Sequence, residues 1–377
     1  MKVLQICSYY AINDLYKNLF SNLNLKSIKS DVYIPCKKKN IPNDKKYNEF
    51  YSDVYKNGDN LYEKIANIIS QYQFYNKNNE IYKDMKDKLK IDSYSILHAH
   101  SLFENGYLAY RAKKEFGIDY VVAVRNTDVN GYFKIARHLR KIGVEIMKNA
   151  KKVIFISPSY KDFVLHNYIK EKDFEYINNK CLVEPNGIDD YWINNISEEV
   201  KNLKDRNEIR LIQVGRVDRN KNIETSIEIC KELRNRGIKS FIKIVGDGDE
   251  KKNLIDKYKS LEYVKFYDKA SKENLKEYYD DSDIFIMPSK YETFGLVYPE
   301  AMSRGLPIVY TKGQGFDKYF EDGEVGYPII YDSVNEGVGA VIDIIENYNF
   351  ISNNAKNNSQ RFSWDIISND YKNIYLE

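Results

Sequence analysis

The chain of 377 residues is 43% hydrophobic and 30% charged, a composition typical of globular proteins with packed cores. At about 150 residues per domain, this length predicts two domains. The formal net charge, 58 − 55 = +3, disfavours a dedicated nucleic-acid-binding protein. Residues 1–152 carry 27 Lys and Arg against 16 Asp and Glu, whereas the remaining residues carry 31 against 39. We therefore expect a basic and an acidic domain that face different partners, with no nucleic acid among them.

The four cysteines, Cys7, Cys36, Cys181 and Cys230, are far apart and form no C-x-x-C pair. This pattern is typical of reduced thiols in a cytosolic protein. No apolar run approaches the roughly 18 to 20 residues of a membrane span, and the first residues resemble a strand more than a signal peptide. We expect a cytoplasmic protein.

Short and almost continuous apolar runs recur along the chain, each followed by a turn and a stretch with helical spacing. Such runs are typical of parallel strands buried on both faces. They are Val3–Cys7, Val32–Pro35, Ile96–His98, Tyr120–Val124, Val153–Ser157, Arg210–Val214, Phe241–Val245, Val264–Tyr267, Asp283–Met287 and Ile308–Tyr310. Residues 36–60 are polar and irregular and predict an exposed excursion. Ten strands alternating with helices predict an α/β protein with two doubly wound parallel-sheet domains.

The alternation is interrupted at Pro185-Asn186-Gly187 and in the polar stretch that follows, up to Glu208. Near the C-terminus, Ser363 is a candidate N-cap for an amphipathic helix. Its apolar residues have the spacing of one helix face: Trp364, Ile367, Tyr371 and Ile374. We expect a first domain over residues 1–190, a second over 191–358 and a closing helix over 359–377.

Ligands of doubly wound sheets bind beyond the carboxyl ends of the strands, so the residues that follow each strand are candidates for a site. The first strand of the second half is followed by Gly215, Arg216 and Lys221, and the two cations suit a polyanion. The next strand is followed by Gly246-Asp247-Gly248, which leaves room for a phosphate or a base. Without a ligand, the two cations would simply be solvated in a loop, and the Gly246-Asp247-Gly248 segment would be an ordinary tight turn. No G-x-G-x-x-G follows any strand, which disfavours a nicotinamide-dependent dehydrogenase.

Residues 287–309 combine several such features. A strand ends at their start, and a helix is expected to begin near residues 294–296. This helix start would offer unpaired backbone amides to a phosphate, those of Phe294, Gly295 and Leu296. Glu292 lies just before it and Glu300 inside the helix, and carboxylates accept hydrogen bonds from sugar or ribose hydroxyls without a metal. Taken alone, either glutamate could equally be a charge on the protein surface. Together with the amides and the upstream cations, the two glutamates predict a sugar-nucleotide site.

Residues 292–309, ETFGLVYPEAMSRGLPIV, resemble the E-x7-E signature of the retaining glycosyltransferases of family GT4 (glycosyl transferases group 1), which have the GT-B fold. Gly215-Arg216 with Lys221 resembles the donor-diphosphate pair of that family, and Pro185–Asp189 its interdomain segment. The resemblance covers most of residues 181–377 and is weaker before them. It implies two Rossmann-like domains facing a central cleft, with a C-terminal helix that returns to the first domain.

The resemblance also implies roles for individual residues. Arg216 and Lys221 would neutralise the leaving diphosphate, and Glu292 would bind hydroxyls of the transferred sugar, so these three are the expected catalytic residues. The expected donor-binding residues are Gly215, Gly246, Phe294, Gly295, Leu296 and Glu300, with Glu300 on the ribose and the amides on the distal phosphate. No metal and no cofactor are expected besides the co-substrate, a nucleotide-diphosphate sugar, for which a UDP-sugar is the expected choice.

The first domain departs from the family pattern. Where many members have a His after the strand Tyr120–Val124, this chain has Arg125-Asn126-Thr127-Asp128. We expect Asn126 and Asp128, with His100, to contact the acceptor or the sugar. His98 and His100 lie on one face of a strand end, which leaves three interpretations: half a metal site, the lining of an acceptor cleft, or packing and turn hydrogen bonds.

The stretch Tyr132–Lys152 has helical spacing. Ile135, Leu139, Ile142 and Ile146 share an apolar face, and Lys134, His138, Lys141 and Lys148 lie away from it. The basic face suits anionic lipid headgroups or a lipid-diphosphate acceptor. The alternative is a helix that packs on the core and exposes its charges to solvent.

We therefore expect a metal-independent retaining glycosyltransferase. It would move a hexosyl or N-acetylhexosaminyl group to a hydroxyl of a saccharide, lipid-linked or small-molecule acceptor, in cell-surface polysaccharide or glycolipid biosynthesis. The basic first domain adds a peripheral contact with the inner face of the membrane. The alternatives are a sugar-nucleotide epimerase of the same fold and a non-catalytic partner subunit.

Overall fold

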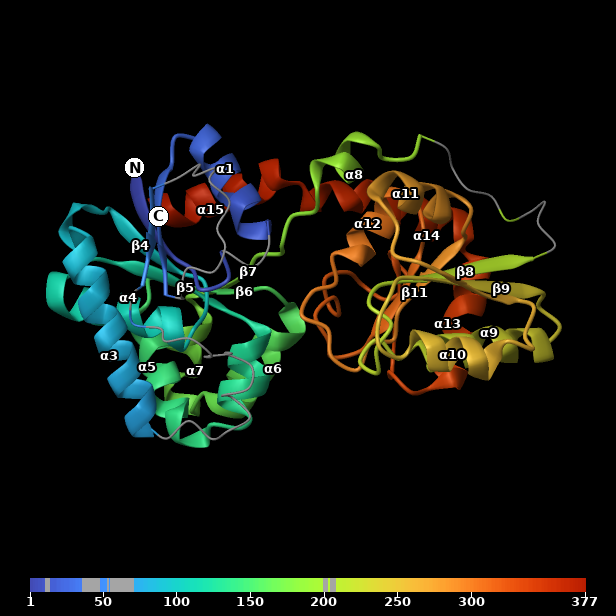
Figure 1. The fold of residues 1–377 in the computed structure, drawn as a ribbon, viewed down its shortest axis with the longest axis horizontal. Helices are drawn as coiled ribbons and strands as arrows, with labels where there is room; N and C mark the ends of the chain where they lie inside the picture. The colour runs from blue at the N-terminus through green and yellow to red at the C-terminus, as the bar shows by residue number, and fades with distance from the viewer. Residues whose placement is uncertain (11–13, 36–47, 53, 55–70, 199–202, 204–207) are drawn as a thin grey trace. The chain divides into compact units, whose positions relative to one another are not determined.

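The computed structural model describes residues 1–10, 14–35, 48–52, 54, 71–198, 203 and 208–377. The chain divides into two compact units, each built on its own parallel sheet (Figure 1). Unit 1 comprises Met1–Ile156, Tyr160–Asn186 and Trp364–Glu377, and unit 2 comprises Ser157–Ser159 and Gly187–Ser363. The α/β architecture with two parallel sheets is confirmed.

The sheet of unit 1 has the strand order β3-β2-β1-β4-β5-β6-β7. Its strands are β1 (Lys2–Ile6), β2 (Lys29–Ile34), β3 (Asn48–Tyr51), β4 (Ile96–Ala99), β5 (Tyr120–Val124), β6 (Lys152–Phe155) and β7 (Cys181–Val183). The helices are α1 (Leu15–Leu25), α3 (Gln71–Lys88), η1 (Ile91–Ser93), α4 (Glu104–Phe116), η2 (Thr127–Phe133), η3 (Arg137–Leu139), α5 (Arg140–Asn149), α6 (Pro158–Tyr168), α7 (Glu171–Asn178) and α15 (Trp364–Leu376). All strand pairs are parallel, so their carboxyl ends meet at one edge.

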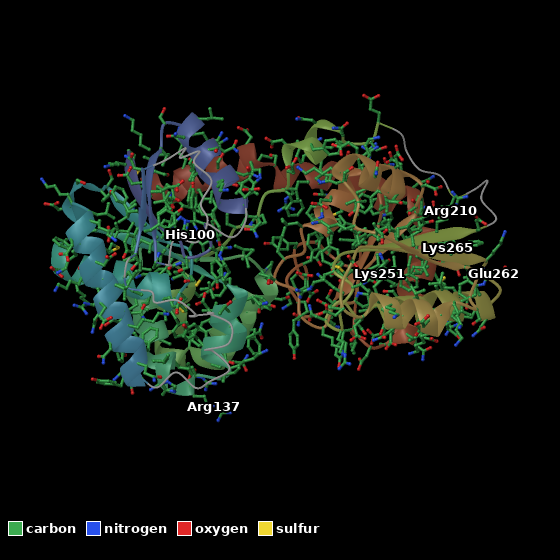
Figure 2. All side chains as sticks on the ribbon, in the orientation of Figure 1. His100, Arg137, Arg210, Lys251, Glu262 and Lys265 are labelled. Carbon is green, nitrogen blue, oxygen red and sulfur yellow. The ribbon has the colours of Figure 1, made fainter. Side chains whose placement is uncertain are left out.

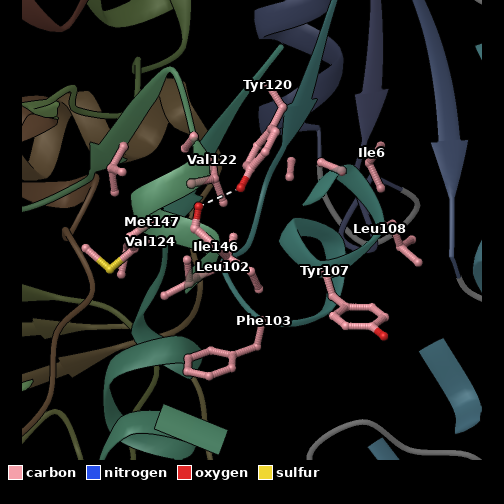
Figure 3. Packing of buried hydrophobic residues seen from close by; sticks show 14 of the residues in the cluster. Ile6, Leu102, Phe103, Tyr107, Leu108, Tyr120, Val122, Val124, Ile146 and Met147 are labelled. Atoms are coloured by element: carbon pink, nitrogen blue, oxygen red, sulfur yellow. Dashed lines mark hydrogen bonds between the residues drawn. The ribbon is translucent and has the colours of Figure 1, made fainter. Parts of the chain in front are cut away.

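The interior strand β5 is buried on both faces, as its uninterrupted apolar sequence predicts. Side chains on a strand alternate between the faces: Tyr120, Val122 and Val124 belong to the core under α4 and α5, and Val121 to the core on the other face. Figure 3 shows the first of these cores, where the Tyr120 hydroxyl donates a hydrogen bond of 2.6 Å to the Ile146 carbonyl. This bond satisfies a polar group that burial would otherwise leave unpaired.

The C-terminal helix α15 belongs to unit 1 and lies beside α1 (Figure 1). Its buried residues include all four apolar positions expected from the sequence, Trp364, Ile367, Tyr371 and Ile374. They pack with residues of α1 and with the second face of the sheet. The chain thus returns to its first unit, as the family resemblance implied.

The sheet of unit 2 has the strand order β10-β9-β8-β11-β12-β13. Its strands are β8 (Ile209–Val214), β9 (Ser240–Val245), β10 (Val264–Tyr267), β11 (Ile284–Ile286), β12 (Ile308–Thr311) and β13 (Gly326–Ile329). The helices are α8 (Asp190–Asn194), α9 (Ile223–Asn235), α10 (Lys251–Tyr258), α11 (Lys272–Asp280), α12 (Val297–Ser303), α13 (Val334–Glu346), α14 (Tyr348–Asn358) and η4 (Ser359–Phe362). The order reverses between β8 and β11, the place where doubly wound sheets bind ligands.

The stretch Tyr132–Lys152 is not one helix, so that prediction is wrong. A π-helix, η2, follows β5 directly, and α5 begins only at Arg140. Leu139 and Ile146 are buried, but Ile135 is 57% exposed because it lies in the turn between η2 and η3. The turn after η2 and the short 3-10 segment η3 interrupt the 3.6-residue period on which the predicted apolar face depends.

Three cysteines, Cys7, Cys181 and Cys230, are buried free thiols, and Cys36 lies outside the described residues. Within the described part of the chain, no helix combines the length and the apolar content that crossing a bilayer requires.

The ends of β8 and β9 approach so closely that a side chain has no room at Gly246. A Cβ there would lie 1.8 Å from the carbonyl oxygen of Gly215, and its φ of 153° is a conformation that other residues rarely adopt. We expect Gly246→Ala to lower the free energy of unfolding by about 3 kcal/mol or more in chemical denaturation, because the strand ends must separate.

Gly237 is the matched control for Gly246. It also has a positive φ, 85°, but nothing lies within 4 Å of a Cβ built there. Gly237→Ala should therefore cost only the backbone strain of about 1 kcal/mol. Equal losses for the two substitutions would contradict the close approach of β8 and β9.

Candidate functional site

The loop after β8 is held in shape by the carboxylate of Asp218. One of its oxygens accepts a hydrogen bond from the backbone amide of Lys221 at 2.9 Å, and the other forms an ion pair of 2.5 Å with Arg216. The Gln213 side chain, at the end of β8, donates to the Lys221 carbonyl at 2.7 Å. These bonds fix where the Lys221 side chain leaves the loop.

Lys221 and Glu292 form an ion pair between the loops that follow β8 and β11. The Nζ–Oε2 distance is 2.5 Å, and the side chains are only 19% and 12% exposed. Glu292 is held in place because its backbone amide donates to Gln314 at 3.1 Å and its carbonyl accepts from Gly315 at 2.9 Å. The structure therefore brings together two of the three predicted catalytic residues.

Arg216, the third, has an exposed side chain, at 76% of its surface. It lines a cavity of about 420 Å³ together with Gly215, Gly246, Asp247 and Lys269. This cavity opens at the carboxyl ends of β8 and β9, so Gly215, Arg216 and Gly246 share one concave surface. The candidate site of unit 2 thus has an exposed cation, Arg216, a half-buried cation, Lys221, and a cavity beside them.

Glu300 lies in a different set of contacts, in the first turn of α12. The pKa of its carboxyl group is raised to about 8, mainly by burial and also by the charge of Asp189, whereas the charge of Lys272 and a hydrogen bond from Trp192 lower it. Asp189 itself forms an ion pair with Lys272. Glu300 is thus a carboxyl group held near neutrality, able to donate as well as accept a hydrogen bond.

Helix α12 begins at Val297, slightly later than predicted, and has only seven residues. The backbone amides expected to hold a phosphate, those of Phe294, Gly295 and Leu296, precede it and donate to no acceptor within the described residues. Gly295 has a φ of 82°, and a Cβ there would lie 2.4 Å from the Tyr298 ring. Glycine thus permits the turn that leaves these amides unpaired.

The raised pKa of Glu300 gives a stability prediction. Its folded-state value, about 8, lies above the ordinary value of 4.5, so its neutral form stabilises the fold at low pH and this stabilisation is lost as the pH rises toward 8. The Glu300→Gln variant does not lose this stabilisation, because the glutamine side chain stays neutral at every pH. Between about pH 5 and about pH 8.5, we expect the melting temperature of this variant to rise relative to that of the natural chain, by the equivalent of about 4 kcal/mol.

Glu262→Gln is the control for this measurement, because Glu262 is exposed at the edge of unit 2 (Figure 2). Its melting temperature should track that of the natural chain at every pH. A difference between Glu300→Gln and the natural chain that stays flat, or shrinks, as the pH rises would contradict the environment described for Glu300.

The predicted acceptor residues of unit 1 fall into two groups. Asp128 is 1% exposed, and its oxygens accept backbone hydrogen bonds from Leu102, Phe103 and Arg125 at 2.8 to 3.1 Å. Burial raises its pKa to about 6, against the effect of these bonds and of Arg125. These contacts favour a positioning role for Asp128 over contact with a sugar. Asn126, which precedes the π-helix, is half-buried, and its predicted contact stays a prediction.

His100 is fully buried and is not on the surface of unit 1. Its Nε2 pairs with Gln5 Oε1 at 2.8 Å, and the neighbouring His98 Nδ1 pairs with the Tyr375 hydroxyl at 2.7 Å. Burial lowers the pKa of both rings. Of the three interpretations, packing with turn hydrogen bonds fits these contacts best. The described residues contain no cluster of His, Cys, Asp or Glu that could hold a metal ion.

Several residues that shape this site are absent from the predictions. Asn220 and Gln314 hold the segment before Glu292 through side-chain bonds to backbone groups. Trp192 and Lys272 set the environment of Glu300. Each is a single polar or aromatic residue in an ordinary loop or short helix. Only the contacts across the fold distinguish them, so the sequence carries no local signal for them.

The chain is similar to known glycosyltransferases. The model of the family "Glycosyl transferases group 1" matches residues 195–361, which hold every predicted residue of unit 2. The alpha-monoglucosyldiacylglycerol synthase of Acholeplasma laidlawii is 26% identical over 312 residues, 77% of this chain and 76% of its own.

Solved structures show the same fold at lower identity. Sucrose-phosphate synthase from Thermosynechococcus elongatus superposes with a TM-score of 0.74 at 18% identity, over 100% of this chain and 98% of its own. Anabaena HepE, solved in complex with UDP and glucose, superposes with a TM-score of 0.62 at 17% identity, over 99% and 98%. Residues 195–361 therefore match the glycosyl transferases group 1 family, and the chain as a whole has the GT-B fold.

Proposed function

We propose that this protein is a retaining glycosyltransferase that uses a nucleotide-diphosphate sugar, with unit 2 binding the donor and unit 1 the acceptor. The observation that carries the proposal is the Lys221–Glu292 ion pair beside the cavity lined by Arg216, at the strand ends where doubly wound sheets bind ligands. It combines cations for a diphosphate with a carboxylate for sugar hydroxyls. The HepE structure, which holds UDP and glucose, supports a UDP-sugar as the donor.

In the proposed reaction the bond between the anomeric carbon and the diphosphate oxygen breaks, and its electron pair stays on the diphosphate. Arg216, Lys221 and the unpaired amides before α12 would face this growing negative charge, and they would then stabilise the transition state more than the ground state. The acceptor hydroxyl attacks the anomeric carbon from the side of the leaving group. Its proton passes to a leaving phosphate oxygen, and the configuration is retained.

Glu292 would accept hydrogen bonds from hydroxyls of the transferred sugar, and Glu300 would bind the ribose. We propose that the two cations replace a metal ion as the counter-charge of the diphosphate. The acceptor is then a saccharide, a lipid-linked sugar or a small molecule, in polysaccharide or glycolipid biosynthesis in the cytoplasm. The similarity to a glycolipid synthase supports this assignment.

A transfer assay with the purified full-length chain tests the proposal. The donors are UDP-, GDP- and ADP-glucose and UDP-N-acetylglucosamine, each with alkyl glycoside and diacylglycerol acceptors, with and without EDTA. We expect an α-linked product by NMR from these α-linked donors, and equal rates with EDTA. A β-linked product would contradict retention. An isomerised sugar nucleotide formed without any acceptor would identify an epimerase instead.

A further inference from the structure

Arg125, which directly follows β5, is a buried cation that forms no ion pair with the residues the structure describes. The whole residue exposes only 7% of its surface to solvent. Among the described residues, no carboxylate forms an ion pair with its guanidinium group. Its Nε donates a long hydrogen bond of 3.4 Å to the His100 carbonyl, and the Tyr371 hydroxyl accepts another. A guanidinium has five N–H donors, so most of its capacity is unused.

The groups around Arg125 are neutral. The ring of Tyr16 lies 5.9 Å from its guanidinium carbon, and burial raises the pKa of Tyr16 and, to about 12, that of Tyr371. Burial lowers the pKa of His100, which therefore carries no charge at neutral pH. The Cys7 thiol also faces this group. None of these side chains supplies the negative charge that a buried arginine requires.

The two nearby carboxyl groups do not supply it either. The oxygens of Asp128 are occupied by three backbone amides, so its charge acts on Arg125 only from a distance. Glu184 lies near Tyr371, and burial, together with the charge of Asp370, raises its pKa to about 8, which keeps it largely neutral. Among the described residues, no carboxylate thus contacts the guanidinium group directly, and the charge of Asp128 is engaged by backbone amides.

We infer that Arg125 binds an anionic group, a carboxylate or a phosphate, on the acceptor. This inference rests on the proposed function, because it assigns the acceptor to unit 1. Arg125 lies at the carboxyl ends of β4 and β5, the edge of a doubly wound sheet that binds ligands. The planar fork of arginine pairs with both oxygens of a carboxylate or phosphate. The acceptor class is therefore an acidic sugar, a sugar phosphate or a phosphate-bearing lipid.

Anion binding tests the inference without any transfer reaction. Thermal unfolding is followed with inorganic phosphate, glucose 6-phosphate, glucuronate or glucose added. The chain carries Lys221→Met in all arms, because this substitution removes the proposed phosphate contact of unit 2. We expect glucose 6-phosphate and glucuronate to raise the melting temperature and glucose to leave it unchanged. Whichever of the two anionic sugars gives the larger shift shows whether the site prefers a phosphate or a carboxylate group.

Arg125→Met should abolish this response and leave the melting temperature without anions unchanged or higher, because it removes an unpaired buried charge. The control is Arg137→Met, since Arg137 is exposed on the surface of unit 1 while His100 lies inside it (Figure 2). A lower melting temperature with an unchanged anion response would overturn the inference and make Arg125 a structural residue. If Arg125→Met does not fold, Arg125→Lys replaces it. That variant should bind the anion about tenfold more weakly, because lysine lacks the fork, and unchanged affinity would overturn the inference.

A second readout separates this inference from the proposed function. With an active acceptor pair, one anionic and one neutral, Arg125→Met should raise KM about 100-fold for the anionic acceptor and leave kcat and the KM of the neutral acceptor within about threefold. Equal effects on both acceptors would overturn the anionic assignment. Absence of transfer with a retained, Arg125-dependent anion response would reject the proposed function and keep the anion site.

Discussion

Replacing Lys221 by methionine should lower kcat/KM for sugar transfer about 1000-fold, or about 4 kcal/mol of transition-state stabilisation. Methionine keeps the length of the apolar stem but removes the ammonium group that lies 2.5 Å from Glu292 and beside the Arg216 cavity. The lost charge is one that would face the diphosphate as its negative charge grows. Steady-state kinetics with the donor at saturating and limiting concentrations measure the loss.

Lys265→Met is the matched control for this substitution. Lys265 lies on the edge strand β10 with its side chain exposed (Figure 2), and it forms no ion pair with the described residues. Its kinetics should equal those of the natural chain. The assignment of Lys221 fails if its variant keeps more than about a tenth of the natural kcat/KM while remaining folded.

The second large effect is expected for Glu292→Gln, which should lower kcat about 100-fold. Glutamine keeps the size of the side chain but loses the charge, so it binds sugar hydroxyls and Lys221 more weakly. Because Glu292 is placed on the sugar rather than on the nucleotide, the variant should bind UDP as the natural chain does and UDP-sugar more weakly. Calorimetric titration with both ligands separates the two effects.

Glu262→Gln, on the exposed edge of unit 2, controls for a general effect of removing a carboxylate. The double variant Lys221→Met/Glu292→Gln should lose less than the product of the two single losses, since the two residues interact directly. Strict additivity, or an equal loss of UDP and UDP-sugar binding in Glu292→Gln, would place Glu292 outside the sugar site.

The sequence predicts most of the fold because the strands are buried on both faces. The segments Tyr120–Val124 and Val264–Tyr267 coincide with β5 and β10, and the other eight predicted strands differ from the observed ones by a few residues at their ends. The missed strands lie at the edges or are short. β3 falls in the stretch expected to be an exposed excursion, most of which lies outside the described residues, and β13 contains Gly326 and Pro328, which a sequence analysis assigns to turns.

The candidate site of unit 2 could be predicted because its residues follow strands of one sheet. A parallel sheet brings strand ends to a common edge, so Lys221 and Glu292, 71 positions apart, meet without any local signal between them. The same argument was too coarse in unit 1. It placed His100 at an acceptor site because this residue follows β4, and the family resemblance placed Asp128 there. Neither argument could show that both residues are buried and occupied by internal hydrogen bonds.

Arg125 illustrates what the sequence could not supply. It stands in the segment that departs from the family pattern, yet an arginine after a strand is usually solvated or paired. Only the structure shows that it is buried and forms no ion pair with the described residues. The unusual π-helix that follows it is a second feature that no apolar period predicts.

The central claim, that unit 2 binds a nucleoside diphosphate through Arg216 and Lys221, is tested most directly by calorimetric titration of the full-length chain with UDP, GDP and ADP. We predict one binding site for one of these nucleotides, with affinity about 100-fold weaker in the Arg216→Ala/Lys221→Met variant and unchanged in Lys265→Met. Failure of all three nucleotides to bind, or equal affinity in the doubly substituted chain, would contradict the account.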